Sequence, residues 1–274
     1  MSKLYVSENG GLIYDEETER NTPAWKQVLL KIVIVLLVLF LAAEIAWYFL
    51  VLPSTTQVRI TVTGNTRVGM DELCNMAGIN GSETWMRFSS PEVAARLAAN
   101  PLFERVRVEK HFPDRVVVTV TERQPVALAF GLVNGRTVPL EIDRAGVVFR
   151  IGSGGNINLP LLTGLTIENP VPGMRLDVQL RQLLEQLALV EQRNPVLAAS
   201  LSEIKIEEKT YGGYDLVVYP VHTPIRVRTD RALNEASLQY MMLVLDVVQD
   251  LALDVDEIDI RAGTVAYRVK GESL

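Results

Sequence analysis

The chain has 274 residues, of which 48% are hydrophobic and 22% charged, with a net charge of -6 and a pI near 5.2. This composition supports a folded core, and the acidic balance argues against a protein that binds nucleic acid through a basic surface. The only cysteine, Cys74, and two histidines, His111 and His222, cannot supply an internal disulfide or a Cys/His zinc site. We therefore expect neither a metal nor a cofactor.

The first 24 residues are polar and show no apolar periodicity, which predicts a disordered tail. An apolar run then extends from Val28 to Leu52, and a helix needs about 20 such residues to cross a bilayer. Trp25 and the pair Trp47 and Tyr48 stand about 33 Å apart at the rise of a helix, a spacing that suits two membrane interfaces. The sequence therefore predicts a transmembrane helix over residues 25–52.

Two charges interrupt this run. Lys31 can extend its amine to the inner interface. Glu44 lies one turn from the far aromatic residues, where its carboxyl either reaches headgroup water or contacts a partner transmembrane helix. A cleaved signal peptide is the alternative to an anchor, but its apolar region would have only about 7–15 residues, with small residues at the cleavage site.

Basic residues set the orientation of the helix. Arg20, Lys26 and Lys31 lie on its N-terminal side, and the next basic residue is Arg59. The positive-inside rule places residues 1–24 in the cytoplasm and residues 54–274 outside the cytoplasmic membrane.

Residues 55–125 predict a β-α-α-β-β module. Alternating apolar residues indicate strands at 57–63, 103–110 and 115–123. Short helices are expected around Val68 to Met76 and at 91–99, the second with Ser90 as its N-cap. Gly64 and Asn65 predict a sharp turn after the first strand.

Three stretches of this module resemble the POTRA domain of the FtsQ/DivIB cell-division proteins. They are Val62–Asn65 (VTGN), Asn100–Val106 (NPLFERV) and Phe112–Ala127 (FPDRVVVTVTERQPVA). A POTRA domain has no catalytic residues, so the resemblance implies a module that recognises other proteins through its surface and strand edges.

Residues 126–270 predict a mostly antiparallel sheet with two helices on one face, which makes the whole chain α+β. The strands are expected at 126–130, 137–142, 147–149, 202–209, 214–219, 225–228, 257–261 and 264–270. The helices are expected at 177–192 and 230–249, the second with Asp230 as its N-cap.

This second module resembles the β-domain of FtsQ/DivIB. The matching stretches are Ile142–Phe149 (IDRAGVVF), Leu159–Gly164 (LPLLTG) and Ile258–Arg261 (IDIR). The family often carries an Asp-Gly turn in the central hairpin, where this chain has Tyr219–Pro224 (YPVHTP), so no residue of the hairpin tip is transferred.

No motif predicts catalysis. Gly152–Gly155 lacks the Gly-Lys-Ser/Thr of a phosphate-binding loop, and we expect a plain loop there. Asp254, Asp256, Glu257 and Asp259 lack the glycine of a calcium loop and are expected on a solvated surface. His222 has no nucleophile and acid arranged beside it.

The last strand is the expected partner-binding site, because a terminal strand leaves one row of backbone groups unpaired. Its residues are Thr264, Val265, Ala266, Tyr267, Arg268 and Val269. The resemblance implies a non-enzymatic scaffold that binds FtsB/FtsL-type division proteins at the septum. The alternatives are that this strand is only the outer edge of the sheet, or that the chain is a POTRA-containing chaperone or secretion factor, or an anchored enzyme.

Overall fold

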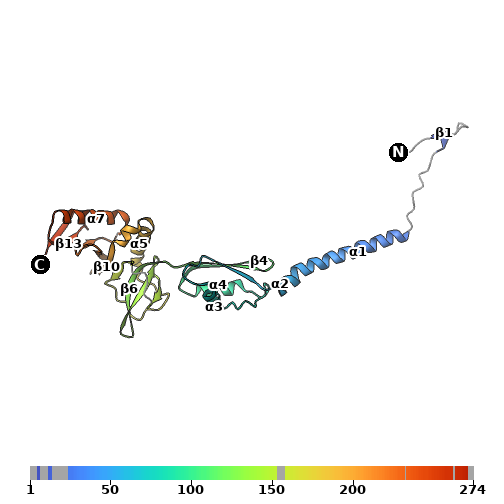
Figure 1. Ribbon diagram of the computed structural model, residues 1–274, viewed down its shortest axis with the longest axis horizontal. Helices are drawn as coiled ribbons and strands as arrows, with labels where there is room; N and C mark the ends of the chain where they lie inside the picture. Colours follow the sequence, from blue (N-terminus) through green and yellow to red (C-terminus); the bar gives the residue numbers. More distant parts are fainter. Residues whose placement is uncertain are drawn as a thin grey trace. The chain divides into compact units, whose positions relative to one another are not determined.

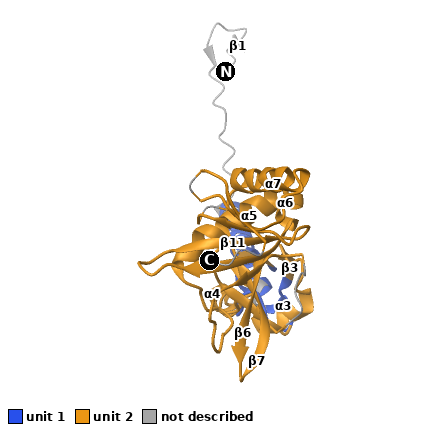
Figure 2. Ribbon diagram, turned by 90° about the vertical axis from the view of Figure 1, so that its left-hand side faces the viewer, with its two compact units in different colours: residues 1–59, 81–88, 111–115 blue, residues 60–80, 89–110, 116–274 orange. Residues whose placement is uncertain are grey.

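The computed structural model describes residues 5–6, 12–13, 24–152, 158–231, 233–261 and 263–270. Most of the predicted tail, and residues 153–155 of the predicted glycine-rich loop, lie outside the described residues. Within the tail, β1 (Tyr5–Val6) and β2 (Leu12–Ile13) pair antiparallel. The chain divides into two units: residues 1–59, 81–88 and 111–115 form one, and the other residues form the second (Figure 2).

The first unit contains the apolar helix. It runs through α1 (Ala24–Ala46), a π-helical turn (η1, Trp47–Val51) and α2 (Leu52–Thr55) (Figure 1). Over Trp25–Val51, 27 residues, it is long and apolar enough to cross a membrane, and none of this stretch is buried within the protein. Lys31 and Glu44 are both exposed on α1. The predicted helix is thus confirmed in length and position.

The β-α-α-β-β order is also confirmed. The elements are β3 (Arg59–Thr63), α3 (Met70–Ala77), α4 (Ser90–Ala98), β4 (Phe103–His111) and β5 (Arg115–Glu122), with the strands in the order β3-β5-β4. Every second residue of β5 is buried, as are Leu73 of α3 and Leu97 of α4. The helices therefore supply the apolar layer that the alternation of β5 requires.

The turn after β3 needs a glycine. Gly64 has a φ of +83°, and a Cβ atom there would stand 2.1 Å from the carbonyl oxygen of Val120. Asn65 then donates from Nδ2 to the carbonyl oxygen of Val68 at 3.0 Å. The predicted Gly64-Asn65 turn is therefore fixed by a close approach of two backbones.

The second module is built on a nine-stranded sheet in the order β14-β13-β12-β11-β10-β9-β6-β7-β8. Most neighbours are antiparallel, but β9 is parallel to both β6 and β10, and β12 is parallel to β13. The strands are β6 (Pro125–Val133), β7 (Arg136–Asp143), β8 (Val148–Ile151), β9 (Leu161–Thr163), β10 (Leu201–Glu208), β11 (Tyr214–Pro220), β12 (Arg226–Thr229), β13 (Val255–Asp259) and β14 (Ala266–Val269). The strand assignments from sequence omitted β9, which joins the two halves of the sheet.

Helices cover one face of this sheet (Figure 1). After a 3₁₀ turn (η2, Val178–Leu180) come α5 (Arg181–Arg193), α6 (Pro195–Ala199) and α7 (Glu235–Asp250). Their apolar side chains form a single core with inward-facing residues of the strands. The short helix α6 was not predicted, and it adds a third helix to the two expected.

Two predicted N-caps are wrong by a few residues. Helix α4 begins at Ser90, so the N-cap is Ser89, and Pro91 lies in the first turn. Helix α7 begins at Glu235, where the side chain of Asn234 accepts a hydrogen bond from the N–H of Ser237. Asp230 instead directly follows β12, five residues before the first residue of the helix.

Candidate functional site

The predicted binding strand lies at the margin of the nine-stranded sheet. Four of its residues, Ala266 to Val269, form β14, and Thr264 and Val265 lead into it. Strand β13 is its neighbour on one side, and on the other side the described part of the chain supplies no strand. All six side chains are exposed except that of Arg268, which is half-buried.

A row of apolar side chains crosses the sheet and ends in the open at β14. Register pairs join the residues of this row from β10 to β14: Ile204, Val218, Val227, Ile258 and Tyr267. The first four are at most 1% exposed, whereas Tyr267 is 56% exposed. The core therefore continues to the last strand, where no further strand of the described chain covers it.

The backbone of β14 is open on the same margin. The N–H of Lys270 donates to the carbonyl oxygen of Asp254 at 3.0 Å, so this residue points toward β13. Backbone groups alternate in direction along a strand, which turns the N–H and C=O groups of Val265, Tyr267 and Val269 outward. These three residues also carry the large exposed apolar side chains of the segment.

The opposite face of the sheet carries a network of charges. Arg228 on β12 reaches Glu207 of β10 at 2.6 Å and Glu257 of β13 at 3.4 Å. Arg268 on β14 continues this network to Glu257 at 3.3 Å and to Asp256 at 2.9 Å. The polar side of β14 is thus already paired with β13, while no strand among the described residues pairs with its outer backbone and its apolar side chains are exposed.

The predicted acidic surface is part of this network. Arg261 binds Asp259, and Arg268 binds Asp256 and Glu257, so three of the four predicted acidic residues hold arginines. The hydrogen bond from Arg268 lowers the pKa of Asp256. For Glu207, hydrogen bonds from Lys205 and Arg228 lower the pKa. These carboxylates are therefore engaged in holding the strands together.

Helix α7 carries a second apolar stripe that was not predicted from the sequence. Its core stripe is Leu238, Met241, Leu245 and Val248, as predicted in part. On the outer side, the helix exposes Tyr240, Leu243, Val247 and Leu251. The signal was present in the sequence, because these residues also recur at helical spacing.

The two flanks of α7 differ in their neighbours. Ser200, which follows α6, has its Oγ 4.0 Å from the sulfur of Met242, so α6 adjoins the flank of Met242. Val244 lies about half a helical turn away on the opposite flank and packs against the core. Tyr240 and Leu251 share the flank of Val244, away from α6, and are exposed there.

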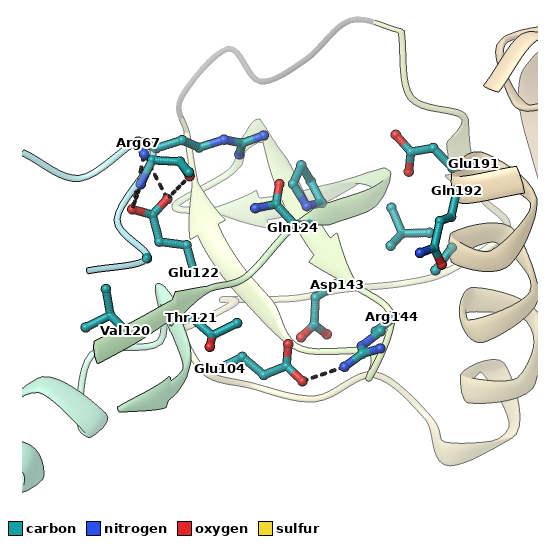
Figure 3. A pocket seen from close by; sticks show the side chains of 15 residues that line it. Arg67, Glu104, Val120, Thr121, Glu122, Gln124, Asp143, Arg144, Glu191 and Gln192 are labelled. Carbon is teal, nitrogen blue, oxygen red and sulfur yellow. Dashed lines mark hydrogen bonds and ion pairs between the residues drawn. The ribbon is translucent and has the colours of Figure 1, made fainter. Parts of the chain in front are cut away.

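A polar cleft of about 650 Å³ lies between the β-α-α-β-β module and the sheet (Figure 3). Arg144 closes one part of it by pairing with Glu104 at 2.7 Å. The carboxylate of Glu122 accepts hydrogen bonds from the backbone of Thr66, Arg67 and Val68. These contacts pair Glu104, Arg144 and Glu122 with groups of the protein itself, and the pair of Arg144 with Glu104 joins the two modules across the cleft.

Among the residues that the structure describes, no three His, Cys, Asp or Glu side chains gather as a metal site. Cys74 on α3 is half-buried, and His222 lies exposed in the turn between β11 and β12.

Comparison with known proteins agrees with the resemblance found in the sequence. The family model for the POTRA domain of FtsQ type matches residues 56–123. A cell division protein FtsQ of Geobacter sp. (strain M21) is 33% identical over 40% of this chain, and one of Syntrophotalea carbinolica is 26% identical over 63%. These matches cover 38% and 59% of the two relatives, less than two thirds of each.

A cell division protein FtsQ of Myxococcus fulvus is 28% identical over 77% of this chain and 72% of its own length. This alignment is longer than the POTRA domain alone, so the similarity extends into the sheet or the apolar helix. The matched POTRA domain of FtsQ type, the apolar helix before it and the mixed sheet after it, together with relatives named cell division protein FtsQ, support the resemblance to the FtsQ/DivIB family.

Proposed function

We propose that this protein is a non-enzymatic scaffold of the bacterial cell-division machinery. The helix Trp25–Val51 anchors it in the cytoplasmic membrane, and strand β14 binds an FtsB/FtsL-type partner by strand addition. The POTRA domain contributes further contacts with division proteins at the septum. The observation that carries the proposal is the apolar row that ends in exposed Tyr267 beside outward-facing backbone groups, in a chain whose relatives are named as cell division proteins.

The geometry of β14 defines the strand that would fit. A partner strand would bond to the outward N–H and C=O groups of Val265, Tyr267 and Val269. Its inward residues would extend the apolar row over Tyr267. Its alternate residues would lie on the face of Arg268 and be polar. We therefore expect a partner segment that alternates apolar and polar residues.

The proposed orientation places the N-terminus in the cytoplasm. Lys26 and Lys31 lie in the first turns of α1, and the side of the helix that leads to β3 has no basic residue until Arg59. The positive-inside rule then places the POTRA domain and the sheet outside the membrane. The FtsQ-type match of the POTRA domain favours a division role over a chaperone or secretion factor.

The test combines localisation with crosslinking. A fluorescent fusion is expected to form a midcell band in dividing cells, and a photoreactive amino acid at Tyr267 is expected to crosslink an FtsB-type protein. Tyr267→Ala should weaken capture of that protein while the variant stays folded. A photoreactive group at Tyr211, which is fully exposed in the β10–β11 turn, serves as the matched control. Equal crosslinking from both positions would remove β14 as the site.

A further inference from the structure

Four aromatic side chains meet where the apolar helix ends. The ring of Phe112 lies 5.2 Å from that of Tyr48, 5.5 Å from that of Phe49 and 5.6 Å from that of Trp85, measured between ring centroids. Phe112 comes from the turn between β4 and β5, and Trp85 from the loop between α3 and α4. We refer to these four residues as the aromatic cluster, and all of them belong to the first unit.

Backbone bonds hold both loops to the chain that leaves the helix. The N–H of Val58 donates to the carbonyl oxygen of Glu83 at 3.0 Å, and that of Arg59 donates to the carbonyl oxygen of Asp114 at 2.7 Å. Arg59 also binds the Asp114 carboxylate at 2.9 Å. Gln57 pairs with Thr84 as an isolated bridge. These bonds therefore hold both loops against the chain at the end of the helix.

The position of Phe49 sets the depth of the cluster. Phe49 lies two residues before Val51, the last residue of the stretch that can cross a membrane, so it stands roughly 3 Å inside that end. The interfacial layer on each side of the hydrocarbon core is about 5–8 Å thick. The ring of Phe112 stacks on Phe49 and meets Tyr48 edge-on, so it must lie at the same depth as these two residues, in the interfacial layer.

The composition of the two loops suits that level. Met86 is 54% exposed and Phe112 38% exposed, so both loops present apolar side chains at the surface of the protein. Arg87 and Arg115 are exposed in the same loops, and guanidinium groups favour phospholipid headgroups. Tryptophan is itself enriched at membrane interfaces.

We propose that the loops Gly81–Phe88 and His111–Arg115 form a lipid-contacting surface in the interfacial layer of the bilayer, with Met86 and Phe112 inserted among the headgroups and Trp85 packed against Phe112. The occupant of this surface is the phospholipid around the apolar helix, because the surface is continuous with that helix through Tyr48 and Phe49. The POTRA domain would thus touch the membrane with two of its own loops, in addition to following the anchor. This inference rests on the proposed membrane anchor.

The chain has three tryptophans, Trp25, Trp47 and Trp85, which allows a direct test. The full chain carrying Trp25→Phe and Trp47→Phe retains only Trp85 and is reconstituted into phosphatidylcholine/phosphatidylglycerol liposomes. Phospholipids brominated near the headgroup end of the acyl chain are expected to quench Trp85 about twofold more strongly than those brominated near the methyl end. Adding Phe112→Ser should reduce this quenching, with circular dichroism showing that the variant is folded.

A second variant separates the inference from the anchor. Trp25→Phe with Trp85→Phe retains only Trp47, which lies in the helix itself. One outcome is that brominated lipids quench Trp47 strongly but Trp85 no more than free N-acetyltryptophanamide. That result would contradict the proposed lipid-contacting surface and leave the proposed anchor supported. If neither tryptophan is quenched, the anchor is wrong and the inference falls with it. Quenching of both, with the expected depth for Trp85, supports the inference.

Discussion

The guanidinium of Arg123 lies 2.5 Å from the carboxylate of Asp143, and their side chains are only 15% and 4% exposed. Arg123 is the last residue of the POTRA match, and Asp143 ends strand β7 of the sheet. Arg123 also donates from Nε to the carbonyl oxygen of Pro101 at 3.0 Å. This buried pair therefore ties the POTRA domain to the sheet at the point where the chain passes between them.

Removing one partner of this pair should be costly. Arg123→Ala leaves the carboxylate of Asp143 buried without its counter-charge, and we expect a loss of about 3–5 kcal/mol in the free energy of unfolding. Urea denaturation of the detergent-solubilised protein, followed by circular dichroism, measures it. Arg144→Ala is the control, since the Arg144–Glu104 pair is more exposed and should contribute about 0–1 kcal/mol. Equal losses in the free energy of unfolding from the two variants would contradict the role of the Arg123–Asp143 pair as a buried tie between the modules.

Glu122 should make stability depend on pH. Burial alone would raise its pKa, but hydrogen bonds from the N–H groups of Val68, Arg67 and Thr66 outweigh burial and lower the pKa. A lowered pKa in the folded state gives stability above the unfolded value, about 4.3, and this stability is lost as the pH falls below it. Glu122→Gln should cost roughly 1–3 kcal/mol at neutral pH.

The difference between Glu122→Gln and the unaltered protein should shrink in acid. Urea denaturation at several pH values measures the two proteins side by side. Once the carboxyl of Glu122 is protonated in the folded state, both proteins lack the carboxylate and should converge in stability. A difference that stays constant into the acid range would show that the charge of Glu122 does not matter.

Proline substitutions distinguish the outer edge of β14 from the edge that is paired with β13. Val265→Pro removes an N–H that points outward, so the folded protein should lose less than about 1 kcal/mol. It should nevertheless weaken capture of the FtsB-type partner by about fivefold or more, the value of one hydrogen bond. Ala266→Pro removes an N–H that points to β13 and should destabilise the sheet itself. Thermal melting measures the loss of stability and pull-down measures partner capture. Similar melting temperatures for the two variants would contradict the assigned directions of the N–H groups of Val265 and Ala266.

The two apolar stripes of α7 should respond differently to truncation. Met241 is 1% exposed and belongs to the core, so Met241→Ala should cost about 2–5 kcal/mol. Leu243, two residues along, is 60% exposed, and Leu243→Ala should stay within about 0.5 kcal/mol. Chemical denaturation compares them, and a large loss for Leu243→Ala would mean that the outer stripe is covered within the protein.

Gly64 should not tolerate a side chain. Its φ of +83° and the 2.1 Å approach to Val120 predict a loss of roughly 1–3 kcal/mol for Gly64→Ala from backbone strain alone. Gly69→Ala is the matched control, because a Cβ at Gly69 meets nothing within 4 Å. The midpoint of thermal unfolding should fall clearly for the first variant only.

Local patterns predicted most single elements correctly. The alternation in β5 and the turn at Gly64 are properties of a few neighbouring residues, and both were confirmed. The helix starts at Ser90 and Glu235 were displaced because several polar residues near each start can cap a helix, and packing selects one. Strand β9 escaped prediction because its three residues, Leu161 to Thr163, are too few to show an alternation.

Composition and spacing along the chain were enough to predict the membrane-length helix, the β-α-α-β-β order and the family resemblance. The position of β14 at the margin of nine strands, the place of Tyr267 at the end of a buried row and the stacking of Phe112 on Phe49 became visible in the folded chain alone. Burial and exposure could not be predicted because they depend on which distant segments cover a residue. Two apolar stripes on one helix show the same spacing in the sequence, although neighbouring elements bury one of them, as at Met241, and leave the other exposed, as at Leu243.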